Sequence, residues 1–140
     1  MLIQLFLGAG LVTVSVGLHA VVLDNVALRL RRITARQRAR PTGLRRFYAL
    51  MAGAVAAFLS HVVQIWIWAV VYRLAGEFDT MQTALYFSTS SFTTVGYGDV
   101  TASPDWRLLG SFESAAGMLL FGLSTAFLFE VMRDVWRDID

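Results

Sequence analysis

The chain has 140 residues, of which 56% are hydrophobic and 16% are charged, and its mean hydropathy is +0.59. A soluble domain is nearer half apolar and about 25% charged, so this composition excludes an ordinary soluble domain and favours a bilayer location. The formal net charge of +2 comes from arginines gathered in one segment, which argues against a nucleic-acid partner, and the absence of cysteine excludes disulfides, cysteine-ligated zinc and thiol catalysis.

Residues 2–23 are an almost unbroken apolar run, close to the roughly 20 residues that cross a bilayer as a helix. They predict a first transmembrane helix. A cleaved signal peptide is the alternative, but the positive charge that precedes such a run is missing. Gly8, Gly10 and Gly17 could let a neighbouring helix approach closely, or could simply reflect how common glycine is in such helices. His19 lies within the apolar run, where a helix-packing role is favoured over metal binding.

Residues 29–46 contain many arginines, no acid, and Pro41, which predicts a loop on the cytoplasmic side by the positive-inside rule. Met1 is then expected outside and Asp140 inside. An anionic-lipid site is the alternative reading of the same charge, because each such arginine adds about 1 kcal/mol of attraction to an acidic leaflet. The arginines concerned are Arg29, Arg31, Arg32, Arg36, Arg38, Arg40, Arg45 and Arg46.

Residues 47–74 predict a second transmembrane helix, longer than the minimum and therefore free to tilt. Trp66, Trp68 and Tyr72 lie near its outer end, where amphipathic aromatic side chains favour the membrane interface. His61 and Gln64 are polar residues within it. Such groups usually face protein rather than lipid.

Residues 76–104 are not expected to cross the membrane. The pair Asp79-Thr80 is typical of a helix start, and residues 81–92 have room for about three turns, too few to span. Non-helical backbone at membrane depth must be buried in protein or line water, so this segment predicts a re-entrant helix followed by an extended strand that several subunits enclose. The carboxyl end of the short helix would present its negative dipole end to a cation.

Residues 108–132 predict a third transmembrane helix that carries an acid, Glu113. An unpaired charge there would cost about 2.5 to 3.5 kcal/mol, so Glu113 is expected to be paired, protonated or turned to protein. The hypothesis is that it accepts hydrogen bonds and supports the adjoining strand from behind; a protonated carboxyl filling a polar gap is the alternative. The candidate donors are Ser88, Thr89, Ser91 and Gln64.

Residues 94–99 read T-V-G-Y-G-D, and they resemble the selectivity filter of tetrameric potassium channels. The resemblance implies that a dehydrated K⁺ ion is held by rings of oxygen atoms, the hydroxyl and carbonyl of Thr94 and successive backbone carbonyls above it. Gly96 and Gly98 would allow the alternating left- and right-handed dihedrals that this arrangement needs. Tyr97 is expected to point away and brace the strand. The ion-binding residues implied are Thr94, Val95, Gly96, Tyr97 and Gly98, with K⁺ on the first four.

The resemblance extends over residues 47–132, and the third span is similar to the inner helix of small bacterial potassium channels. It implies a hinge at Gly117 and an aromatic cuff around the filter, formed by Tyr86 and Phe87. Ser90 stands where some bacterial members have a glutamate, and the first helix is outside their two-helix pattern. A stripe spaced by three and four residues is expected to line the cavity, or alternatively to face lipid or a neighbour. The stripe is Met118, Phe121, Thr125 and Phe129, and the expected filter supports are Asp99, Glu113, Ser90, Tyr86 and Phe87.

The predicted fold is an all-α membrane protein with three transmembrane helices, a re-entrant pore helix and a filter loop, assembled as a fourfold homotetramer. Its divisions are an additional helix (1–28), an arginine-rich linker (29–46), a pore domain (47–132) and a cytoplasmic tail (133–140). The predicted function is passive potassium conduction across a cell membrane, by the resemblance a bacterial inner membrane. No enzymatic activity and no cofactor beyond the permeant K⁺ are expected. A non-conducting or regulatory subunit of another channel or transporter is the alternative.

Overall fold

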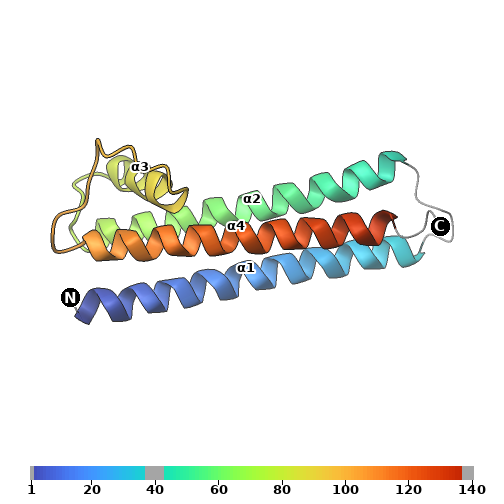
Figure 1. The fold of residues 1–140 in the computed structure, drawn as a ribbon, viewed down its shortest axis with the longest axis horizontal. Helices are drawn as coiled ribbons and strands as arrows, with labels where there is room; N and C mark the ends of the chain where they lie inside the picture. The colour runs from blue at the N-terminus through green and yellow to red at the C-terminus, as the bar shows by residue number, and fades with distance from the viewer. Residues whose placement is uncertain (1, 37–42, 137–140) are drawn as a thin grey trace.

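The computed structural model describes residues 2–36 and 43–136, and every regular element in these ranges is a helix. α1, α2 and α4 are long and lie side by side, while the short α3 packs against α2 and α4 at one end (Figure 1). This confirms the predicted all-α class. The bounds are α1 Leu2–Arg36, α2 Gly43–Leu74, α3 Met81–Phe92 and α4 Arg107–Trp136.

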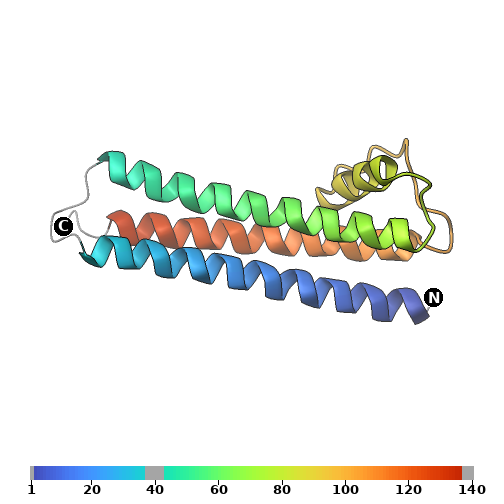
Figure 2. The same ribbon diagram turned by 180° about the vertical axis from the view of Figure 1, so that it is seen from behind.

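Within residues 2–36 and 43–136, three segments are long and apolar enough to cross a bilayer: Leu2–Arg32, Arg46–Leu74 and Arg107–Asp134. By contrast, the 12 residues of α3 rise only about 18 Å at 1.5 Å per residue, well short of the hydrocarbon thickness of about 30 Å. α3 is therefore too short to cross a bilayer. The start of α1 lies at the same end as α3, and the end of α4 lies at the opposite end (Figure 2).

The boundary between the first two long helices differs from the sequence prediction. The expected loop began at Arg29, but α1 continues to Arg36 and α2 begins at Gly43. The prediction of an irregular segment was therefore wrong for these helical parts. Arginine is a good helix former, so a charged face alone does not end a helix that has already begun. Arg38 and Arg40 lie outside the described residues.

The largest fully buried apolar side chains come from α2, α3 and α4, so the core lies between these three helices. Aromatic rings dominate it, and each ring removes a large apolar area from contact with lipid or water. The core thus fixes α3 at one end of the bundle. Its largest members are Trp68, Tyr72, Phe92, Leu109 and Leu120.

α1 packs on α2 and α4, on the side away from α3 (Figure 1). A close approach occurs at Gly8, where an added Cβ would lie 2.7 Å from the ring of Phe112 on α4. A Cβ added at Gly10 or at Gly17 would meet no atom within 4 Å. Of the three glycines considered from the sequence, one therefore serves helix packing within the chain.

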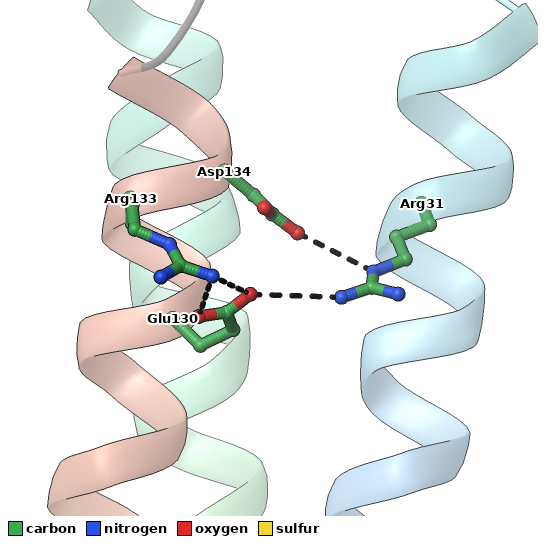
Figure 3. Close-up of polar contacts among 4 residues, drawn as sticks. All are labelled: Arg31, Glu130, Arg133 and Asp134. Carbon is green, nitrogen blue, oxygen red and sulfur yellow. Dashed lines mark hydrogen bonds and ion pairs between the residues drawn. The ribbon is translucent and has the colours of Figure 1, made fainter.

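The opposite end of α1 is joined to α4 by ion pairs (Figure 3). Arg31 Nη2 lies 3.8 Å from Glu130 Oε1, and Arg31 Nε lies 3.3 Å from Asp134 Oδ2. Arg133 Nη2 lies 2.6 Å from Glu130 Oε2 on its own helix. These groups are partly exposed, where such pairs contribute about 0 to 1 kcal/mol, so they orient the helix ends more than they stabilise the bundle.

Candidate functional site

The site begins with the short helix α3, whose start follows the predicted pattern. Thr80 is extended, with φ −126° and ψ 148°, and its Oγ1 accepts the Thr83 N–H at 3.1 Å. Its carbonyl accepts the Ala84 N–H at 3.1 Å. At the other end, Thr93 donates its N–H to the Thr89 carbonyl at 3.1 Å. Each end of α3 thus has hydrogen bonds to some of its terminal backbone groups, and the chain continues directly from α3 into residues 94–99.

Residues 94–99, the extended segment after α3 that is called the strand below, have left-handed dihedrals at every second residue from Thr94 to Gly98. The φ angles are 61° at Thr94, 56° at Gly96 and 79° at Gly98. This alternation turns every second peptide over, so that successive carbonyls can share one side instead of alternating as in a β-strand. The two glycines were expected from the sequence, but Thr94 was not. A threonine in this region costs about 1 to 3 kcal/mol, a strain that proteins retain mostly at functional sites.

Ser90 on α3 holds the strand by its amide groups. Its carbonyl accepts the Gly96 N–H at 3.1 Å, and its Oγ accepts the Tyr97 N–H at 3.2 Å. The Thr94 N–H donates to the Ser91 carbonyl at 3.0 Å. Among the described residues, no donor reaches a carbonyl oxygen of residues 94–98. Three of the five N–H groups of residues 94–98 are therefore engaged by α3, and the carbonyl oxygens stay available for a cation.

A second support links α3 to the far end of the strand. Tyr86 Oη donates to Asp99 Oδ2 at 2.7 Å, and the Val100 N–H donates to Asp99 Oδ1 at 3.0 Å. The hydrogen bond from Tyr86 lowers the pKa of Asp99, and the same bond raises the pKa of Tyr86. The rings of Tyr86 and Tyr97 stack with centroids 6.5 Å apart and planes 14° apart. Tyr97 thus packs on α3 beside the strand.

Phe87, which was paired with Tyr86 in the expected aromatic cuff, turns to the core instead. It is buried and packs edge-on against Tyr72, with ring centroids 5.1 Å apart, and its ring lies 5.0 Å from that of Phe78. A Cβ at Gly110 would lie 3.2 Å from the Phe87 ring. The structure therefore brings Tyr86 to the strand and places Phe87 behind α3. Its role in a cuff stays a prediction.

Glu113 is fully buried and bridges α4 to both α2 and α3. Ser88 Oγ lies 2.5 Å from Glu113 Oε1, and Tyr72 Oη donates to Glu113 Oε2 at 2.8 Å. Ser88 Oγ also lies 2.8 Å from the Ile65 carbonyl on α2. The hydrogen bond from Ser88 was among those expected, whereas Tyr72 was assigned from the sequence to the membrane interface. Three other described candidates make no hydrogen bond to Glu113: Thr89, Ser91 and Gln64.

A protein-family model described as "Ion channel" matches residues 50–134, from α2 through α3 and the strand to α4. The match covers more than half of the chain. The chain belongs to this ion channel family. Neither the curated proteins nor the solved structures contain a match. Most of α2 and α4 lies within the matched part, while α1 precedes it.

In this ion channel, Gly117 is a point of contact between α4 and α3. It is buried, and a Cβ there would lie 1.9 Å from the Phe92 carbonyl oxygen at the end of α3. α4 is helical through this position. The glycine is thus explained by close packing of α4 against the carboxyl end of α3, just before residues 94–99. The expected hinge at Gly117 stays a prediction.

The stripe expected on the inner helix lies on an open face of the channel chain. Met118 and Phe129 are 60% and 59% exposed, Phe121 is 38% exposed, and Thr125 is also exposed. The Thr125 hydroxyl bonds its own helix at the Phe121 carbonyl, 2.9 Å away. These side chains are available to line a cavity formed by several chains, and their role in a constriction stays a prediction.

Proposed function

We propose that the chain is a potassium-selective channel subunit that conducts as a fourfold homotetramer. The observation that carries the proposal is the strand 94–98, in which the φ angle is positive at every second residue. The N–H groups of Thr94, Gly96 and Tyr97 bond to α3, while the carbonyls receive no hydrogen bond from the described residues. A dehydrated K⁺ ion needs rings of such oxygens. One strand supplies one side of each ring, so several copies must surround the axis. The exposed position of residues 94–99 in the single chain is consistent with this.

The test is potassium flux from purified protein in liposomes, with sodium as the competing ion. We expect potassium to be favoured and the active particle to contain four chains. Thr94→Ala removes a hydroxyl from the inner end of the filter and should weaken that site, while Thr125→Ala removes a hydroxyl from the open face of α4 and should leave the filter intact. Equal sodium and potassium permeability, or a conducting dimer, would overturn the proposal.

We also propose that the start of α1 lies outside the cell and the end of α4 lies in the cytoplasm of a bacterial cell. The support is the odd number of spanning segments together with the arginines at the junction of α1 and α2. Enzymatic reporters fused to each terminus test this orientation. Two cytoplasmic termini would contradict it.

The same arginines are proposed to contact anionic lipid headgroups. Arg29 and Arg32 lie near the end of α1, and Arg46 lies near the start of α2, close to the proposed cytoplasmic surface. Arg31 is already paired with acids of α4, so lipid would compete with these acids. Potassium flux should rise or fall when anionic lipid is added to neutral liposomes, and the change should shrink when Arg29 and Arg32 are replaced by glutamine. An unchanged flux in both proteins would reject the lipid site.

A further inference from the structure

α1 precedes the part of the chain that matches the ion channel family, yet a buried polar group joins its middle to the pore helices. We call this group the histidine cluster: His19 on α1, Ser60, His61 and Gln64 on α2, and Ser124 on α4. None is more than 8% exposed. Polar side chains in a membrane span are costly unless they bond to one another, so the cluster is a specific attachment of α1.

Two histidines share one hydroxyl in this cluster. His19 Nε2 and His61 Nε2 each lie 2.9 Å from Ser124 Oγ. His19 Nδ1 lies 2.9 Å from Ser60 Oγ, and the two rings stack with centroids 4.7 Å apart. A continuous hydrogen-bonded chain therefore runs from His61 through Ser124 and His19 to Ser60, across all three membrane-spanning helices.

The shared Ser124 hydroxyl limits how many protons the two histidine rings can hold in this series of hydrogen bonds. Ser124 has one hydrogen to donate, so when both rings are neutral one Nε2 can accept it while the other donates its own hydrogen to Oγ. His61 Nδ1 is buried and has no partner among the described residues. A further proton on His61 must therefore displace the Ser124 hydrogen bond or sit on Nδ1 without a partner. A further proton on His19 Nδ1 can be donated to Ser60 Oγ, but it leaves a buried positive charge. Each outcome either breaks a hydrogen bond that attaches α1 or adds a buried charge without a counterion beside it, and both weaken the attachment.

Among the described residues, no carboxylate is placed to neutralise such a proton. On α4, Glu113 and Glu130 lie eleven residues before and six residues after Ser124, about 16 Å and 9 Å along the helix at 1.5 Å per residue. Glu113 bonds to other side chains near α3, and Glu130 pairs with arginines at the far end. On α1, Asp24 is exposed.

The remaining elements around the cluster bring no countercharge either. The charged residues that bound the α2 span, Arg46 and Arg73, lie at its two ends. On α3, the ring of Phe92 contacts His61, and Leu85 and Thr89 line a cavity together with His61, but none of these side chains is charged. The two rings are therefore the titratable groups at this depth within the described residues.

The cluster also contacts two rings that the proposed function places beside the filter and the cavity, those of Phe92 and Phe121. The His61 ring lies 4.8 Å from the Phe121 ring and 5.8 Å from the Phe92 ring, and those two rings lie 5.8 Å apart. Phe92 ends α3 just before the filter strand, and Phe121 belongs to the stripe on α4. A change in the position of His61 would thus reach both the base of the filter and the inner helix.

We propose that His19 and His61 are positioning residues for conduction: their neutral chain fixes α1 to α2 and α4, and a further proton loosens it and lowers channel opening. The inference rests on the proposed potassium channel function, because conduction reports it. In this proposal, α1 makes the packing of the His61, Phe92 and Phe121 rings depend on pH.

The test compares the full chain with the His19→Gln/His61→Gln double variant in planar bilayers, between about pH 8 and about pH 5, where histidine changes charge. Glutamine keeps a donor and an acceptor without titrating. We expect the parent's open probability to fall about tenfold on acidification, the shift produced if the loosened state binds one proton about tenfold more tightly. The double variant should lose most of this response. A parent that does not respond, or a double variant that responds as the parent does, would overturn the proposal.

The matched control is Ser15→Ala. It removes the 3.3 Å hydrogen bond from the Trp68 indole, another contact between α1 and α2, and leaves both histidines in place. This variant should lower heat stability but keep the pH response. If α1 had a purely structural role, Ser15→Ala and the double variant would change the pH response alike.

Melting of the purified protein at both pH values separates this inference from the potassium channel function. If no variant conducts at any pH, the proposed function fails. The positioning role would then still predict that acid lowers the melting temperature of the parent more than that of the double variant. Equal lowering in both proteins would reject it.

Discussion

Replacing Glu113 by alanine tests whether its buried carboxyl supports the filter through α3. The carboxyl accepts hydrogen bonds from Tyr72 on α2 and from Ser88 on α3. After the replacement, Ser88 still has the Ile65 carbonyl at 2.8 Å, whereas Tyr72 Oη has no other acceptor among the described residues. The cost therefore arises mainly at one buried hydroxyl and at the space left behind.

The magnitude follows from these contacts. An orphaned buried donor costs about 1 to 3 kcal/mol, and hydrogen bonds between membrane helices reach about 1.7 kcal/mol in double-mutant cycles. We expect Glu113→Ala to lower the unfolding free energy by about 1 to 2 kcal/mol per chain, with a changed open probability. Glu113→Gln, which keeps the shape and one acceptor, should do less.

The assay is a double-mutant cycle with Tyr72→Phe, read out by heat denaturation and by single-channel recording. Removing both partners should cost less than the sum of the single changes, because no hydroxyl is then left unsatisfied. Strictly additive losses would show that the Tyr72–Glu113 bond does not couple the helices. Parent-like melting and gating of Glu113→Ala would refute the supporting role.

Three further predictions concern the surroundings of the filter. Ser90→Ala removes the hydroxyl acceptor of a filter amide and should shorten open times in single-channel records, whereas Ser90→Thr, which keeps a hydroxyl, should resemble the parent. Gly117→Ala places a methyl group against the carbonyl that ends α3 and should lower the melting temperature by overpacking, a cost of about 1 to 3 kcal/mol; Gly122→Ala, which meets open space, is the control. The pKa of Asp99 is lowered by the Tyr86 hydroxyl, so its contribution to stability is present at neutral pH and is lost as pH falls through that lowered value. Tyr86→Phe should weaken this acid-dependent loss in melting experiments, and an identical pH dependence would reject it.

Features that depend on neighbouring residues in the chain could be predicted from the sequence. The three spans follow from the length of their apolar runs, and the start of α3 follows from Thr80, whose side chain can cap only the residues just beyond it. The positive φ angles of Gly96 and Gly98 follow from the missing Cβ. The end of α1 was mispredicted because arginine and proline suggested a loop, although arginine also favours a helix.

The partners across helices were decided by the tertiary structure. Each residue along a helix turns its side chain by about 100°, so a small change in rotation or depth replaces one neighbour by another. The sequence showed that Glu113 needed a partner but could not select Tyr72 over Gln64. It likewise placed Gly117 on the inner helix without revealing the carbonyl beside it. Only the packing of three helices brought His19 to the same hydroxyl as a second histidine, because contacts between residues far apart in the chain depend on how whole helices meet.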